Sequence, residues 1–159
     1  DSSDFKVNRL AQISDVDLGR AKGGLLAIAS HNGYEASHGI IHHRKLYLST
    51  GGGNLRGSDH LEYSGAPGEI ARLAVVRFHL HPRVTAAMLN DQRVLIKIRG
   101  NRTGWVFRAN ATVSLDTSLF FDIEGRMNCQ QIVVNMPLAN IRSIGRVAIK
   151  WAFQRNDPQ

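Results

Sequence analysis

The stretch that decides the fold is Arg146-Val147-Ala148-Ile149-Lys150-Trp151-Ala152-Phe153, close to the end of the chain. Its large apolar side chains fall on every second position, and Arg146 and Lys150 stand between them. A β-strand turns successive side chains to opposite faces, so this alternation predicts a strand with one apolar and one polar face. The apolar face is expected in a core.

The same period of two recurs along the chain, and helical periodicity is nearly absent. Strands are predicted near 5–9, 24–30, 38–49, 59–64, 70–81, 93–99, 104–108, 112–115, 119–123 and 129–135. The turn signals between them are Lys22-Gly23-Gly24, Gly51-Gly52-Gly53-Asn54, Asn90-Asp91, Gly100-Asn101 and Glu124-Gly125. We therefore predict an all-β fold, one antiparallel β-sandwich domain of about eleven strands over residues 1–159.

The charge of the chain favours an anionic partner. Its 159 residues include 20 Lys and Arg against 13 Asp and Glu, a net charge of +7, and Arg outnumbers Lys 15 to 5. Arginine forms planar paired hydrogen bonds with carboxylate, sulfate and phosphate, although a codon bias toward arginine explains the count equally well. No nucleic-acid-binding motif and no stretch of ~20 apolar residues is present, so neither nucleic acid nor membrane is expected as a partner.

A single cysteine, Cys129, excludes an internal disulfide and a cysteine-rich metal site. One reduced thiol fits the bacterial cytoplasm or the periplasm equally well. The chain also lacks a G-x-S-x-G nucleophile elbow. Because the first residue is Asp1 and not Met, we expect a processed or excised piece of a longer protein.

The seven histidines give the strongest indication of a site, because all of them lie between His31 and His81. In Arg77-Phe78-His79-Leu80-His81-Pro82, strand alternation puts Arg77, His79 and His81 on one face. Two histidines at i and i+2 can chelate a metal if Asp59 or His60 supplies a third ligand. The alternative is a polar sheet face whose imidazoles bond to neighbouring groups.

A second histidine-rich region begins with His31-Asn32-Gly33-Tyr34, which is predicted to be a turn centred on Asn-Gly. In the strand after it, His42 and Arg44 are expected on one face, and His43 and Lys45 on the other. A His–Arg surface suits a carboxylate or sulfate group. It suits the acidic surface of another domain equally well.

Seven segments, taken in order, resemble the C-terminal β-sheet region of heparinase II/III-like bacterial polysaccharide lyases. They are His31–Tyr34, Gly39–Leu46, Gly57–Leu61, Arg77–Pro82, Gly104–Phe107, Cys129–Val134 and Lys150–Arg155. The resemblance runs from about residue 5 to residue 155.

The resemblance implies an N-terminal α/α toroid as partner domain and cleavage of uronate-containing polysaccharide by β-elimination. In that reaction a base removes the C5 proton, a cation neutralises the carboxylate, and an acid protonates the leaving oxygen. In this family the Tyr and His credited with proton transfer lie mostly in the toroid, so no catalytic residue is assigned here. Zinc, where the family has it, is a cofactor of the parent lyase and is not assigned to this chain.

Three hypotheses follow from the sequence. The first is a noncatalytic C-terminal β-sandwich domain of such a lyase, the second a free-standing module that binds acidic polysaccharide, and the third a small metalloenzyme built on His79 and His81. The residues expected to face a substrate or a partner domain are His31, Tyr34, His42, Arg44, Asp59, Arg77, His79 and His81.

Overall fold

The computed structural model describes residues 10–65, 71–123 and 125–156, which form eleven strands and two four-residue helices. In chain order they are β1 (Ile13–Ala21), β2 (Gly24–Tyr34), α1 (Glu35–His38), β3 (Ile40–Ser49), β4 (Asn54–Tyr63), β5 (Leu73–His79), β6 (Val84–Met88), β7 (Val94–Ile98), β8 (Gly104–Ala109), β9 (Thr112–Asp122), β10 (Gly125–Pro137), α2 (Ile141–Ile144) and β11 (Arg146–Asn156). No helix in these ranges is long and apolar enough to cross a membrane.

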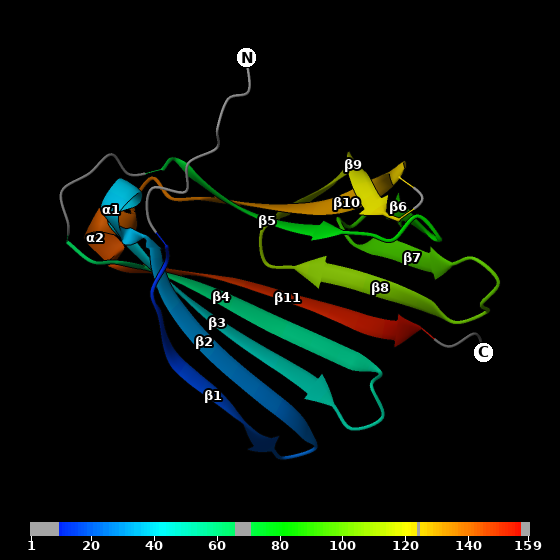
Figure 1. The fold of residues 1–159 in the computed structure, drawn as a ribbon, viewed down its shortest axis with the longest axis horizontal. Helices are drawn as coiled ribbons and strands as arrows, with labels where there is room; N and C mark the ends of the chain where they lie inside the picture. The colour runs from blue at the N-terminus through cyan, green and yellow to red at the C-terminus, as the bar shows by residue number, and fades with distance from the viewer. Residues whose placement is uncertain (1–9, 66–70, 124, 157–159) are drawn as a thin grey trace.

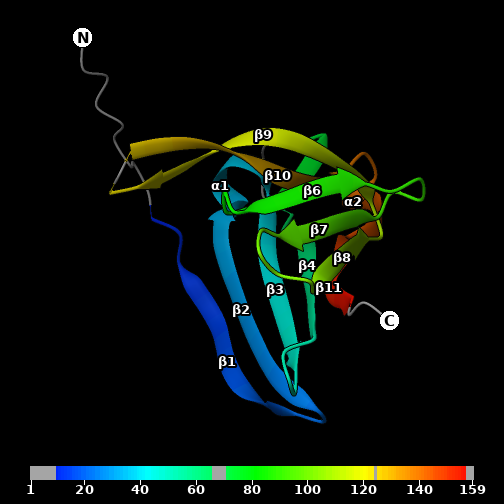
Figure 2. The same cartoon turned by 90° about the vertical axis from the view of Figure 1, so that its right-hand side faces the viewer.

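The strands form two antiparallel sheets. The larger has the order β1-β2-β3-β4-β11-β8-β7-β6, and the smaller has the order β5-β10-β9. The smaller sheet lies over the part of the larger sheet that contains β6, β7 and β8, while β1 to β4 extend beyond it (Figures 1 and 2). We call the side of the larger sheet that faces the smaller sheet its inner face, and the opposite side its outer face. The smaller sheet therefore leaves much of the inner face of β1 to β4 uncovered.

The core lies where the two sheets face each other. Phe78 of β5 packs its ring against Phe107 of β8 and against Trp151 and Phe153 of β11, with ring centroids 5.1, 4.7 and 5.3 Å apart. Phe107 is fully buried, and so is Ile132 of β10. These rings come from both sheets, so the aromatic contact fixes how the sheets are held together.

Gly57 of β4 makes room for Trp151. The two residues are cross-strand partners, so both face the inner side of the larger sheet. A Cβ atom at position 57 would overlap the indole ring of Trp151. The ring can lie flat over β4 only because glycine has no side chain.

The predicted fold class is confirmed, with differences in four places. The strands predicted at 112–115 and 119–123 are one strand, β9, and the strands β1 and β6 were not predicted. The prediction of a turn at His31–Tyr34 is wrong, because β2 continues to Tyr34 and only shifts its register after His31. The Asn-Gly pair therefore forms an irregularity within a strand. The strand predicted at 5–9 lies outside the described residues.

The fit of Trp151 over Gly57 predicts the effect of a small change. We expect Gly57→Ala to lower the free energy of unfolding by about 1–3 kcal/mol, because the added methyl group displaces the indole. Gly53→Ala is the matched control, since a Cβ there meets nothing closer than 3.9 Å. Urea unfolding of both variants measures the difference, and equal stabilities would contradict this account of the packing.

Candidate functional site

Strand alternation and register bring four predicted site residues to the inner face of the larger sheet. His31 of β2 is the cross-strand partner of His42 of β3, and Arg44 of β3 is the partner of Asp59 of β4. As predicted, His43 and Lys45 face the other way, since their partners His60 and Ser58 lie on the outer face. Three neighbouring strands thus present one connected group of polar side chains.

Asp59 is the centre of this group and is 1% exposed. Its Oδ2 accepts a hydrogen bond of 2.8 Å from the indole Nε1–H of Trp151. Its Oδ1 lies 2.8 Å from His42 Nε2 and also accepts a hydrogen bond from Nε of Arg44. Each carboxylate oxygen therefore has a partner, which a buried charge requires.

The partners of Asp59 keep it ionised. Burial by itself would raise the pKa of this carboxyl group, but hydrogen bonds from His42, Arg44 and Trp151 and the charge of Arg44 outweigh it and lower the pKa to about 2. Burial, together with the charges of His42 and Arg44, lowers the pKa of His31 below its ordinary value. Near neutral pH the group thus consists of a carboxylate, a guanidinium and a neutral His31.

The hydrogen bonds from β2 to Asp59 run in one direction. The backbone N–H of Gly33 donates to Nδ1 of His31 over 3.2 Å, so the proton of the neutral ring is on Nε2. Nε2 of His31 then donates to Nδ1 of His42 over 2.9 Å, and Nε2 of His42 donates to Asp59. Both nitrogens of His42 are engaged, so this ring is a positioned link and not a free base.

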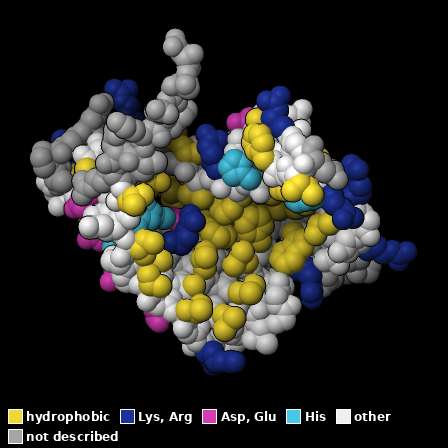
Figure 3. Space-filling view, in the orientation of Figure 1, with side chains coloured by type: hydrophobic (Ala, Val, Ile, Leu, Met, Phe, Trp, Pro, Cys, Tyr) yellow, Lys and Arg dark blue, Asp and Glu magenta, His cyan; other side chains and the backbone are white. Residues whose placement is uncertain are grey.

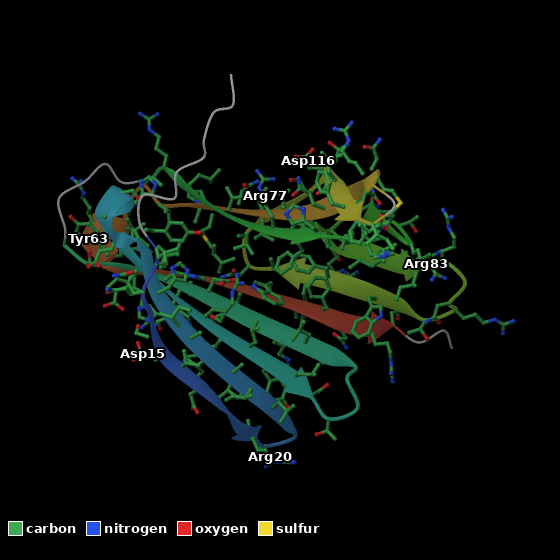
Figure 4. The ribbon with its side chains drawn as sticks, viewed as in Figure 1. Asp15, Arg20, Tyr63, Arg77, Arg83 and Asp116 are labelled. Carbon is green, nitrogen blue, oxygen red and sulfur yellow. The ribbon has the colours of Figure 1, made fainter. Side chains whose placement is uncertain are left out.

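These side chains lie at a pocket of about 370 Å³ between the inner face and β5. Tyr34, His42, Arg44 and Asp59 line it from the larger sheet, and Ala74 and Val76 line it from β5. Arg77 borders the pocket, but it alternates with Phe78, whose ring packs on the larger sheet, and its side chain lies above β5 in Figure 4. The ring of Tyr34 is tilted against that of His31, with centroids 5.3 Å apart. Beside the basic and histidine side chains on this side of the molecule, Figure 3 shows a broad hydrophobic surface.

The other two predicted site residues lie elsewhere. Nδ1 of His79 is 2.6 Å from the hydroxyl of Ser118, and the ring of His81 packs on Phe120 of β9 with centroids 4.8 Å apart. Asp59 faces the inner side and His60 the outer side of the larger sheet, so neither completes a set with these two histidines. The predicted combination of ligands is contradicted.

The inner-face group does not fit a zinc ion either. Arg44 already places a cation against Oδ1 of Asp59, and both ring nitrogens of His42 are occupied by protein partners. The described ranges contain no group of three or more His, Cys, Asp or Glu that could hold a metal ion. What the group offers is one fixed guanidinium, that of Arg44, at the edge of a pocket, which suits an anion.

Trp151 belongs to the site but was not predicted as a site residue from the sequence. Its place in an alternating apolar strand predicts a core residue, which it also is, at 6% exposed. A buried indole needs an acceptor for its N–H, and that requirement was the available signal. The acceptor is Asp59, 92 positions away in the sequence.

The comparisons with known proteins agree with this architecture. A family model described as heparinase II/III-like, C-terminal, matches residues 1–152. The chain belongs to this family. A curated relative of the domain, the FtsZ-localized protein C of Caulobacter vibrioides, is 31% identical over 141 residues, which are 84% of this chain and 24% of that protein.

Two solved structures have the fold of this heparinase-like domain. The heparan sulfate lyase HepC from Pedobacter heparinus superposes with a TM-score of 0.71 at 12% identity, over 93% of this chain and 22% of that one. A heparinase III superposes with a TM-score of 0.67 at 9% identity, over 92% and 22%. The chain thus spans less than a quarter of the length of each of these proteins.

The low pKa of Asp59 predicts how stability depends on pH. A carboxyl group with a folded pKa of about 2 and an ordinary pKa of 3.8 stabilises the fold above pH 3.8, and this contribution is lost as the pH falls through 2. The stability difference between wild type and Asp59→Asn should therefore shrink by about 2 kcal/mol between pH 5 and pH 2. Urea unfolding across this range measures it, with Asp17→Asn, at an exposed carboxylate, as control. A constant difference would contradict the assignment.

The direction of the hydrogen bonds predicts the tautomers. At pH 7.5 both His31 and His42 should carry their proton on Nε2, because the backbone of Gly33 occupies Nδ1 of His31. Long-range ¹H–¹⁵N NMR correlations distinguish the two nitrogens of each ring. A proton on Nδ1 of His42 would mean that this ring is not oriented by His31.

Proposed function

We propose that this chain is the β-sheet domain of a polysaccharide lyase that cleaves uronate-containing acidic polysaccharide by β-elimination. The catalytic groups belong to an α/α toroid outside this chain. The inner-face pocket, with Tyr34 at its lining, binds the anionic substrate or the toroid beside it through the guanidinium of Arg44, which Asp59 holds in place. His42 and His31 support Asp59, and Arg77 only borders the pocket from β5. His79 and His81, which lie away from the pocket, have no part in this proposal.

The observation that carries the proposal is the guanidinium of Arg44, held by buried Asp59 at the pocket. Among the described residues, Arg44 donates only its Nε–H, to Asp59, so the remaining four N–H donors can serve a ligand. Its side chain is 42% exposed, so these donors are accessible. Abstraction of the C5 proton of a uronate requires that its carboxylate be neutralised, and a fixed guanidinium does this without reorganisation.

The hydrogen bonds of His42 indicate that the proton-transfer residues lie elsewhere. His42 has no unoccupied nitrogen, since one binds His31 and the other binds Asp59. A general base must reach the proton it abstracts with a free lone pair. Orientation and charge neutralisation are therefore the contributions expected from this chain.

An exposed apolar surface supports a partner domain. Leu18, Leu25 and Leu48 are 76%, 48% and 41% exposed, and their registers put them on the inner face. Figure 3 shows hydrophobic side chains over β1 to β4 on this side of the molecule. Contiguous apolar surface of this kind is typical of an interface, and the similar lyases are more than four times as long as this chain.

A free-standing polysaccharide-binding module is the second candidate. The saturated hydrogen bonds of His42 favour it, because they suit binding better than catalysis. The relative from Caulobacter vibrioides also favours it, since that protein is named for its localisation with FtsZ and not for a cleavage reaction.

One assay separates the two candidates. The purified chain and the full-length protein that contains it are mixed with heparin, heparan sulfate, chondroitin sulfate and alginate, and the ultraviolet absorbance of the unsaturated uronate is followed. We expect no rise with the chain alone and a rise with the full-length protein. A full-length protein that binds without any rise would instead favour the binding module.

The role of Arg44 is tested in the full-length protein. Arg44→Gln should lower kcat/KM by about tenfold or more, the cost of a lost hydrogen bond to a charged group. Arg83→Gln, an exposed change beyond β5, is the matched control and should leave kcat/KM unchanged. A normal kcat/KM in Arg44→Gln would remove the guanidinium from the proposal. Lyase activity of the chain alone would instead mean that the catalytic groups lie within this chain.

A further inference from the structure

The outer face of the larger sheet carries a row of four cations. Lys45 of β3 and Lys150 of β11 lie opposite Ser58 of β4, and Arg56 of β4 and Arg108 of β8 lie opposite Ala152 of β11. In strand order, Lys45, Arg56, Lys150 and Arg108 therefore follow one another on neighbouring strands, each offset from the last by two residues. Such diagonal neighbours are ~7–8 Å apart, so the charges form a zigzag line across the sheet.

The cations surround a groove of about 470 Å³. Its lining between them includes Leu26, Tyr47 and Ala152, whose registers put them on the outer face. The guanidinium of Arg56 lies over the ring of Tyr47, 5.7 Å from its centroid, and its Nε donates to Asn54 over 3.1 Å. This part of the groove is thus held in place by its neighbours.

Few acidic side chains neutralise the four cations of the outer face. Within the described ranges, none of the four cations takes part in an ion pair with a carboxylate. Glu62, on the outer face of β4, lies 3.4 Å from Nε2 of His43. Burial, followed by the charges of Arg146, Lys45, His43 and Lys150, lowers the pKa of His60, so this face disfavours one more positive charge.

We propose that this outer groove is a second binding site for the sulfate and carboxylate groups of an acidic polysaccharide, separate from the pocket on the inner face. The choice of ligand rests on the proposed function. A sugar ring has an apolar C–H face that suits the floor of the groove, while its charged groups reach the cations at the rim.

A polypeptide ligand is less well matched. The strands that carry the cations, β3, β4, β11 and β8, are each paired on both sides. An extended peptide binds by adding a strand to an unpaired edge, and this face offers none. Side chains alone are available here, so the ligand must be recognised through its own charges and rings.

The test compares two charge-matched variants of this chain. The outer variant carries Lys45→Gln, Arg56→Gln, Arg108→Gln and Lys150→Gln. The control variant carries Arg83→Gln, Arg99→Gln, Arg102→Gln and Arg126→Gln, four exposed positions outside the groove. Circular dichroism and thermal unfolding establish that both are folded. Binding of fluorescent heparin oligosaccharides is then measured at low ionic strength, where surface charges are least screened.

We expect the outer variant to bind heparin oligosaccharides at least tenfold more weakly than wild type, and the control variant to lose about threefold or less. Equal losses in both variants would mean that only net charge matters and would overturn the proposal. So would an absence of binding by wild type, or tighter binding of poly-glutamate than of heparin.

A third variant separates this proposal from the proposed function. Arg44→Gln by itself changes only the inner-face pocket. If this variant loses binding and the outer variant keeps it, the outer groove is excluded while the inner-face proposal stands. If the outer variant alone loses binding, the second site is supported independently of the pocket. If the outer variant does not fold, Lys45→Gln with Lys150→Gln replaces it, with an expected loss of about threefold or more.

Discussion

A buried carboxylate, Asp59, is the interaction on which the rest of this structure depends. It joins the core to the pocket, because Trp151 binds one of its oxygens from the aromatic cluster while His42 and Arg44 bind the other from the pocket. Removing a charge from water is unfavourable unless every oxygen finds a donor. The three donors come from β3 and β11, the strands on either side of β4, so the requirement of Asp59 fixes the positions of His42 and Arg44 at the pocket.

That constraint explains why the site is rigid and still presents the guanidinium of Arg44 at the pocket. Gly57 admits the indole, the indole reaches Asp59, and Asp59 orients Arg44 toward the pocket. From the other side, the backbone of Gly33 orients His31, which orients His42. The register shift in β2 after His31 is therefore part of the site, since it brings the N–H of Gly33 to the ring of His31.

Much of this architecture could be predicted from the alternation of apolar and polar residues along the strands. This alternation places His42 and Arg44 on one face of their strand and His43 and Lys45 on the other, without any knowledge of the fold. It also places Trp151 in the core. It missed β1, because an irregularity between Ser14 and Asp17 breaks the alternation there. Grouping His31 with Asp59, and excluding His79 and His81, required the order of the strands in the sheets, which depends on long-range contacts that no local pattern contains.

The central claim is that the guanidinium of Arg44, held in place by Asp59, forms a ready-made anion site on the inner face. An NMR titration of the ¹⁵N-labelled chain with a uronate-containing oligosaccharide tests it most directly, because the Nε–H of Arg44 and the indole N–H of Trp151 each give a separate signal beside Asp59. The account predicts saturable shifts of the Arg44 signal with little change in that of Trp151, since the ligand meets the guanidinium and not the core. Saturable binding with both signals unmoved would contradict it.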